Sequence, residues 1–242
     1  MSTLPSLRDP PRPSSRPQLD DSDLGRVLPR SFYARPVLEL ARALLGCLLI
    51  SETDADGDPA AQRTVGTVVE TEAYLGQEDR ASHARAGLTR RTAPMFGEPG
   101  HAYVYLVYGM HSCLNVVGDV PCRAGAVLLR AVEPRDGMEL MRRRRGSAGS
   151  VGPDVRLTAG PARLCQAFGV TRQLDGHDLT AGTRLWLAPP PPGAARPAIL
   201  EGTRIGVAYA GEWAERLWRF RVAGSPSLSR PFPGAVTEGR RR

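Results

Sequence analysis

Two carboxylates, one residue apart, lie in an otherwise apolar stretch of the chain. Glu70 and Glu72 belong to the run VETEAY at 69–74. Because neighbouring side chains of a strand point to opposite faces, the two glutamates share one face and Thr71 points to the other. A carboxylate held among apolar neighbours suits a general base that activates water. A solvated strand face is the alternative, and the pattern supports the two interpretations about equally.

A histidine and several tyrosines follow this pair. His83 lies on an expected loop, where a surface position is the usual interpretation, although a histidine close to a glutamate can also recognise or hydrolyse a substrate. Tyr103 and Tyr105 alternate with apolar residues and therefore face one side of a strand. Tyr108 breaks that alternation at an expected hairpin tip, where a large side chain suits insertion between base steps. An ordinary aromatic strand is the simpler alternative, and the pattern alone favours it.

The composition excludes several other chemistries. The chain contains no lysine, so all 32 basic residues are arginine and Schiff-base chemistry on a lysine is excluded. The four histidines lack metal-ligand spacing, and the His-x-Glu and Pro-Cys-x-x-Cys motifs of zinc deaminases do not occur. We therefore expect no metal. The cysteines, scattered through apolar stretches, are expected to be buried free thiols: Cys47, Cys113, Cys122 and Cys165.

The charge balance suits a polyanionic partner. The formal net charge is +7 and the pI is about 9.8, although a solvated basic surface is the alternative. The arginines at 142–145 are most simply the solvated end of a helix, with phosphate contact the less favoured reading. There is no apolar run of membrane-spanning length and no apolar secretory segment, so a cytoplasmic location is expected, associated with the nucleoid if the source is bacterial.

The elements around these residues are expected to form a sheet with flanking helices. Apolar residues at helical spacing predict helices at 36–45, 136–145 and 161–168. Runs rich in β-branched and aromatic residues predict strands at 47–50, 65–73, 101–108, 113–117, 126–132, 185–187, 204–208 and 217–222. A turn is expected at 54–58 and a stiff proline loop at 189–192.

The fold class predicted from these elements is α+β. We expect a single domain at 28–228, built on a curved, mostly antiparallel β-sheet with flanking helices and a protruding β-hairpin. The Pro-, Arg- and Ser-rich segment 1–27 and the basic segment 229–242 contain few large apolar side chains, and are expected to be disordered tails.

Several motifs occur in an order that resembles the alkyladenine (3-methyladenine) DNA glycosylase family. They are ETEAY at 70–74, YVYLVYGM at 103–110, Asn115, LLRAVEP at 128–134, GPARLC at 160–165, IGV at 205–207 and AGEW at 210–213. The resemblance extends from about residue 29 to residue 227. It implies a monofunctional N-glycosylase of base excision repair, which uses water and no cofactor. Such an enzyme, expected here as a monomer, flips an alkylated purine such as 3-methyladenine out of double-stranded DNA and hydrolyses its glycosidic bond.

The resemblance also implies the catalytic roles. Glu72 would be the general base, and Arg130 and the backbone carbonyl of Ile205 would help to hold the nucleophilic water. An alkylated purine is electron-poor and departs easily, so the transition state would resemble an oxocarbenium ion beside Glu72. One carboxylate would then serve both as base and as electrostatic stabiliser.

The base pocket implied by the resemblance has aromatic walls. Tyr74 and Tyr105 would stack on the flipped base, and His83 would hydrogen-bond near its sugar or its edge. Asn115 would crowd the position that carries the exocyclic amine of guanine. Tyr74, His83 and Tyr105 would together enclose the flipped base.

The hairpin implied by the resemblance would contact DNA. Tyr108 would fill the gap left in the duplex, with Met110 beside it. The sequence departs from some relatives at His111, where they carry an aromatic residue, and in the loop at 118–123. These departures leave the DNA contacts of the hairpin and the range of lesions open, among 3-methyladenine, 7-methylguanine, 1,N6-ethenoadenine and hypoxanthine.

Two other classes of protein remain to be weighed. One is a catalytically idle nucleic-acid-binding module of the same fold, and the other is an enzyme that acts on a purine nucleoside or on RNA. The joint presence of Glu72, Arg130, Tyr74 and His83 disfavours the idle module, because mere binding does not require a base beside aromatic walls. The charge balance does not exclude the second class.

Overall fold

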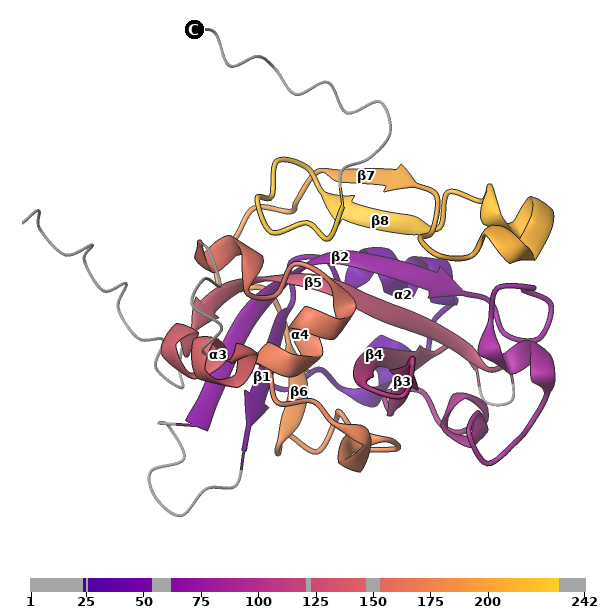
Figure 1. Cartoon of the computed structure of the whole chain (residues 1–242), viewed down its shortest axis with the longest axis horizontal. Helices are drawn as coiled ribbons and strands as arrows, with labels where there is room; N and C mark the ends of the chain where they lie inside the picture. The colour runs from indigo at the N-terminus through magenta and orange to yellow at the C-terminus, as the bar shows by residue number, and fades with distance from the viewer. Residues whose placement is uncertain (1–23, 25, 54–61, 121–122, 147–152, 231–242) are drawn as a thin grey trace, which may run out of the picture.

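The computed structural model describes residues 24, 26–53, 62–120, 123–146 and 153–230 (Figure 1). The turn expected at 54–58, the thiol of Cys122 and nearly all of the expected N-terminal tail lie outside these residues. Within them, no helix is both long enough and apolar enough to cross a membrane.

One antiparallel sheet carries the fold (Figure 1). Its strands run in the order β3-β4-β5-β2-β1-β6, and β8 pairs with β2 and with β7. The strands are β1 (Leu48–Glu52), β2 (Arg63–Tyr74), β3 (Ala102–Val107), β4 (His111–Gly118), β5 (Gly125–Asp136), β6 (Leu185–Ala188), β7 (Ile199–Gly202) and β8 (Arg219–Val222). Every pairing is antiparallel. The α+β class predicted from the sequence is confirmed.

Strand β2 changes its partner along its length. Residues 63–67 pair with β1, whereas residues 70–72 pair with β8, and β5 lies along the other side throughout. The register against β5 shifts on both sides of Glu70, which marks a bulge. Bulges bend a strand and re-aim its side chains. Glu70 and Glu72 therefore lie where the sheet divides between β1 and β8.

Short helices cover the sheet. The α-helices are α1 (Arg30–Tyr33), α2 (Val37–Ala43), α3 (Met138–Arg145) and α4 (Pro161–Ala167). The 3-10 helices are η2 (His83–Ala86), η3 (Ala93–Phe96), η4 (Asp154–Arg156), η5 (Arg172–Leu174) and η6 (Ala208–Ala214). Helix α2 packs against β2 and β5, and α4 packs against β4 and β5. The hydroxyl of Thr71 donates to the carbonyl of Ala41 in α2 at 2.9 Å, so Thr71 points away from the glutamates, as the strand alternation predicts.

Most of the predicted elements are confirmed, but one strand is wrong. The segment expected to be a strand at 204–208 is a loop that leads into η6, and the nearby strand β7 was not predicted. Arg204 is buried in an ion pair, and Gly206 has a φ of 79°, so this backbone does not continue as an extended ladder. Its apolar residues line a cavity and do not face a neighbouring strand.

The cysteines and the chain ends bear on two further expectations. The buried free thiols predicted at Cys47, Cys113 and Cys165 are confirmed. Leu24, inside the expected N-terminal tail, is buried against β1 and β6. Ser229, just past the expected domain limit at 228, hydrogen-bonds to Glu70. The domain limits themselves stay predictions.

A glycine ends β2 and starts the loop that leads to His83. Gly76 has a φ of 82°, and a Cβ atom there would collide with the backbone carbonyl oxygen of Arg123. Gly87, on the far side of η2, has a similar φ of 76° with open space around it. Only glycine adopts such positive φ values at no steric cost, so both positions favour glycine.

We predict that Gly76→Ala destabilises the protein by about 2–5 kcal/mol, from left-handed strain plus steric overlap. Gly87→Ala carries the strain alone and should cost about 1–2 kcal/mol. Urea unfolding of the two variants and the wild type measures the difference. Equal losses would mean that the contact with Arg123 relaxes without cost.

Candidate active site

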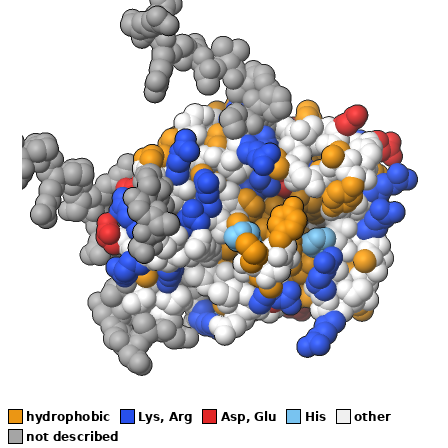
Figure 2. Space-filling view, in the orientation of Figure 1, with side chains coloured by type: hydrophobic (Ala, Val, Ile, Leu, Met, Phe, Trp, Pro, Cys, Tyr) orange, Lys and Arg blue, Asp and Glu red, His pale blue; other side chains and the backbone are white. Residues whose placement is uncertain are grey.

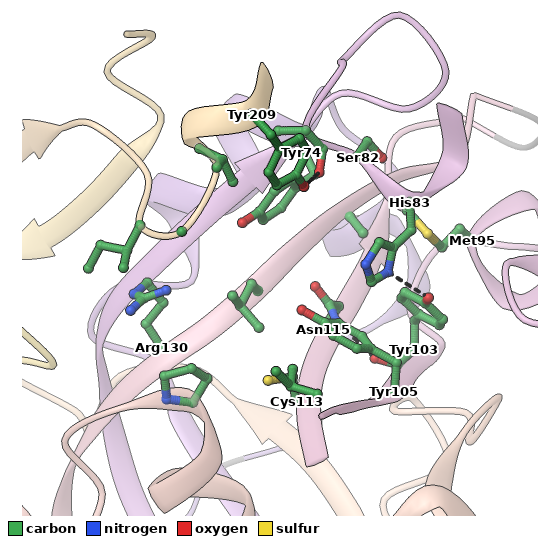
Figure 3. Close-up of a pocket in the computed structure, with 18 of the residues that line it drawn as sticks. Tyr74, Ser82, His83, Met95, Tyr103, Tyr105, Cys113, Asn115, Arg130 and Tyr209 are labelled. Carbon is green, nitrogen blue, oxygen red and sulfur yellow. Dashed lines mark hydrogen bonds between the residues drawn. The ribbon is translucent and has the colours of Figure 1, made fainter. Parts of the chain in front are cut away.

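A cavity of about 360 Å³ opens at the ends of β2, β3, β4 and β5. Its volume lies within the range of small-molecule pockets, about 300–1,000 Å³. Seven of the nine site residues predicted from the sequence line it: Tyr74, His83, Tyr105, Tyr108, Asn115, Arg130 and Ile205 (Figure 3). Glu72 and Met110 are not part of the lining. The structure thus brings together residues that are up to 131 positions apart in the sequence.

Glu72 lies beneath the cavity lining, fully buried and held by three donors. The backbone N–H of Ile205 donates to its Oε1 at 2.8 Å, and a terminal nitrogen of Arg130 lies 3.2 Å from the same oxygen. The hydroxyl of Tyr74 donates to its Oε2 at 2.8 Å. A buried carboxylate is tolerated only with such compensation. The interpretation of a solvated strand face is therefore wrong for Glu72, and it is equally wrong for the fully buried Glu70.

Arg130 lies between the two glutamates. Its Nε donates to Glu70 at 3.1 Å, while its terminal nitrogen faces Glu72. Burial opposes the charge of the guanidinium, but the carboxylates of Glu72 and Glu70 outweigh burial and raise the pKa of Arg130 above its usual value. Arg130 is therefore a permanent cation on the cavity wall.

Three aromatic rings form one wall of the cavity (Figure 3). The ring of His83 lies 4.5 Å from that of Tyr105 at 75°, and the rings of Tyr103 and Tyr105 lie 5.5 Å apart. Nδ1 of His83 hydrogen-bonds to the Tyr103 hydroxyl at 2.9 Å. Burial, together with the positive charge of Arg91, lowers the pKa of His83 to about 4. The imidazole is neutral at pH 7, so one ring nitrogen remains for a ligand.

Asn115 and Cys113 lie on β4 at the floor of the cavity (Figure 3). The Asn115 amide donates to the backbone carbonyl of Tyr103 at 3.1 Å, which fixes the orientation of the side chain. Burial raises the pKa of Cys113, so its sulfur is a neutral thiol and part of an uncharged surface.

A buried ion pair that sequence reasoning missed supports the opposite wall. Arg204 pairs with Asp79, and both side chains are fully buried. The Arg204 guanidinium lies 4.8 Å from the ring centroid of Tyr74 and 4.9 Å from that of Trp218. Burial, followed by the charge of Glu72, raises the pKa of Tyr74 well above its usual value. Arg204 thus holds the Tyr74 ring and, as its chain neighbour, the peptide of Ile205.

The hairpin between β3 and β4 projects beside the cavity mouth. Tyr108 at its tip has a φ of 52° and is 91% exposed, and Met110 is 70% exposed. Figure 2 shows hydrophobic side chains gathered near the centre of this face, with basic side chains around them. All the basic side chains are arginine, because the chain has no lysine. This arrangement suits contact with a polyanion: the arginines would face its negative charges, and the apolar side chains would face its apolar interior.

Among the described residues, no group of three or more histidine, cysteine, aspartate or glutamate side chains has the arrangement to hold a metal ion. The expected absence of a metal and of a cofactor stays a prediction.

Comparison with known proteins gives one consistent result. The family described as methylpurine-DNA glycosylase (MPG) matches residues 31–226. A relative from Methanocella arvoryzae, which carries the name 3-methyladenine DNA glycosylase, is 45% identical over 214 residues, which is 87% of this chain and 99% of the relative. A second, with the same name, from Anaeromyxobacter dehalogenans, is 47% identical over 86% of this chain and 88% of the relative. The human DNA-3-methyladenine glycosylase is 43% identical over 82% of this chain and 66% of its own length.

The lowered pKa of His83 makes stability depend on pH. An unfolded histidine titrates near pH 6.5, whereas His83 in the folded protein titrates near 4. Between these values the unfolded chain binds a proton that the folded chain does not bind. The free energy of unfolding therefore falls as the pH drops from 6.5 towards 4.

We predict that wild type loses about 1 kcal/mol more stability than His83→Gln between pH 7.5 and pH 5, a figure that allows for the partial exposure of the ring. Urea unfolding at both pH values measures the loss. His111→Gln, at an exposed hairpin position, is the matched control and should behave as wild type. The same loss in wild type and His83→Gln would contradict the neutral imidazole.

Proposed function

The chain belongs to the methylpurine-DNA glycosylase family, and from this premise we propose how it acts on DNA. It is a monofunctional DNA N-glycosylase of base excision repair, which flips alkylated purines such as 3-methyladenine out of double-stranded DNA and hydrolyses the glycosidic bond. The observation that carries this proposal is the buried carboxylate of Glu72 beneath an aromatic cavity. A base within a duplex offers no path to C1′, so it must leave the stack first.

The cavity walls favour an electron-poor base. Extrusion costs about a few kcal/mol, and stacking on aromatic side chains returns about 1–3 kcal/mol per base. Tyr74 and Tyr105 are proposed to supply this stacking, and the negative faces of their rings attract a ring that carries positive charge. His83, being neutral, does not repel such a base. Asn115 is proposed to crowd the exocyclic amine of guanine.

Glu72 is proposed as the general base. Its Oε1 already faces two donors, Ile205 N–H and Arg130, whereas its Oε2 faces only the Tyr74 hydroxyl. A carboxylate oxygen accepts two hydrogen bonds, so Oε2 keeps one site for the nucleophilic water. The backbone carbonyl of Ile205 is proposed to accept the second hydrogen of that water. The negative charge of Glu72 also stabilises the positive sugar as the bond breaks.

The hairpin is proposed to keep the base flipped. Tyr108 would fill the gap in the duplex, with Met110 against the neighbouring bases, because large exposed apolar side chains at a hairpin tip wedge between base steps. The surrounding arginines would neutralise phosphates. A single flipped base occupies a single cavity, so we propose that a monomer acts. Its location would follow that of its substrate: the cytoplasm, on the nucleoid in a bacterium.

The idle binding module is the less favoured alternative. A protein that only binds DNA gains nothing from two fully buried glutamates, whose burial costs free energy unless each is compensated. An enzyme acting on RNA or on a free nucleoside shares the cavity chemistry, so it is left as an outcome of the assay below.

We predict that the protein releases an alkylated purine and leaves an intact abasic site. Strand cleavage by a glycosylase requires an amine that forms an imine with C1′, and no lysine exists to supply one. The protein is incubated with duplexes that each carry one lesion: 3-methyladenine, 7-methylguanine, 1,N6-ethenoadenine or hypoxanthine. Each sample is divided, and one half receives hot alkali before a denaturing gel.

Cleavage confined to the alkali half, for at least one methylated purine, is the expected result. Enzyme-dependent strand cleavage without alkali, together with a protein–DNA complex trapped by borohydride, would contradict the hydrolytic proposal. Matched RNA duplexes and free nucleosides serve as competing substrates. Release from these alone would move the protein to the alternative class.

We predict that Glu72→Gln lowers the single-turnover excision rate by about 10²–10⁴-fold, the usual contribution of a general base, and keeps lesion binding within about threefold. The amide retains the size of the side chain and loses the basic oxygen. Glu139→Gln, on the surface of α3, is the control and should match wild type. Near-normal turnover by Glu72→Gln would remove the base role from this residue, with Glu70 the first alternative to test.

A further inference from the structure

The hydroxyl of Ser229 lies in the corner between Arg130 and Glu70. Its Oγ accepts from Nε and from a terminal nitrogen of Arg130, at 3.3 Å and 3.1 Å. The same hydroxyl donates to Glu70 Oε1 at 2.8 Å, and the Ser229 backbone N–H donates to Glu70 Oε2 at 2.7 Å. Ser229 therefore bonds to both members of the Arg130–Glu70 pair. Its hydroxyl contacts both residues, and its backbone N–H contacts Glu70.

These bonds determine the orientation of the Arg130 guanidinium. A guanidinium is planar and rigid, so holding one edge fixes the direction of the other nitrogen. Ser229 and Glu70 accept hydrogen bonds from the edge of the guanidinium formed by Nε and one terminal nitrogen. The remaining terminal nitrogen then lies 3.2 Å from Glu72 Oε1. Without its anchor, the long side chain of Arg130 gains other rotamers, and this contact loosens.

Glu70 fits the role of a support and not that of a base. Like Glu72, it is fully buried and absent from the cavity lining, so its hydrogen-bond partners distinguish the two carboxylates. Both of its oxygens already accept hydrogen bonds from Ser229, and Oε1 also faces Arg130 and, at 3.6 Å, Arg219. Ser229 and Arg219 lie outside the cavity lining, whereas all three donors to Glu72 belong to it.

The fold delivers Ser229 to this corner from the far end of the chain. Strand β8 pairs with β2 at residues 70–72, which places the chain beside both glutamates. A turn at Gly224, with a φ of 75°, follows β8. Residues 225–230 then lead back to Glu70, 159 positions away in the sequence.

We propose that Ser229 is a positioning residue, which aims Arg130 at Glu72 and so keeps the carboxylate in the geometry that activates water. The proposal rests on the roles proposed above for Glu72 and Arg130. It assigns a catalytic consequence to a segment of the chain that lies outside the cavity lining.

The experiment compares three serine variants. Ser229→Ala removes the hydroxyl, and Ser229→Thr keeps it. Ser227→Ala is the matched control, because the buried hydroxyl of Ser227 makes no hydrogen bond within the described residues. Single-turnover release of methylpurines from duplex DNA treated with dimethyl sulfate is measured with the full chain, together with affinity for that DNA and the midpoint of thermal unfolding.

We expect Ser229→Ala to lower the excision rate about tenfold, the scale of one hydrogen bond to a charged group, with affinity changed by less than about threefold. Ser229→Thr should restore most of the rate, and Ser227→Ala should match wild type. A Ser229→Ala rate equal to that of wild type would overturn the proposal. So would a loss that appears in affinity or unfolding alone, or one that Ser227→Ala shares.

A double-mutant cycle separates positioning from a general loss of structure. If Ser229 acts through Arg130, then Ser229→Ala should have almost no further effect in an Arg130→Gln background. Independent, additive losses would overturn the proposal. Glu72→Gln is run in parallel: if it retains full activity, the proposed function fails, whereas an inactive Glu72→Gln with an unaffected Ser229→Ala means that only the role of Ser229 fails.

Discussion

The burial of two carboxylates one residue apart is the constraint on which the rest of the structure depends. Neither Glu70 nor Glu72 has any exposure to solvent, and two like charges so close together in a low-dielectric interior require compensation from several directions. The bulge in β2 aims both side chains at Arg130. The β8 pairing brings Arg219 near them, and the loop before η6 brings the N–H of Ile205. The division of the sheet between β1 and β8 thus gives these charges partners from several segments of the chain.

A second buried pair extends the same logic to the cavity. Arg204 and Asp79 neutralise each other, and each also fixes backbone: Arg204 donates to the carbonyls of Ala73 and Trp213, while Asp79 accepts from the N–H of Ala81. The segment leading to His83 and the segment bearing Ile205 are therefore tied to the end of β2. The Tyr74 ring, the start of the loop to His83 and the segment bearing Ile205 thus share one support.

The sequence allowed prediction of local features but not of long-range compensation. Alternation placed Glu70 and Glu72 on one face, and β-prone runs located most of the strands, because both depend on neighbouring residues. The strand expected at 204–208 was wrong, since a buried arginine and a left-handed glycine do not show in an apolar pattern. Nothing local indicates that Ser229 would reach Glu70. The individual roles of the site residues came from the family resemblance, and the geometry adds which of them touch.

The late position of β8 and Ser229 in the chain has a consequence for biosynthesis. The hairpin of β3 and β4 is complete by residue 118, whereas the groups that surround Glu70 and Glu72 include residues 205, 219 and 229. During translation the two glutamates therefore emerge more than 130 residues before their last partners. A nascent chain must keep them hydrated until these late partners arrive, so the cluster around Glu70 and Glu72 is among the last parts of the protein to be assembled.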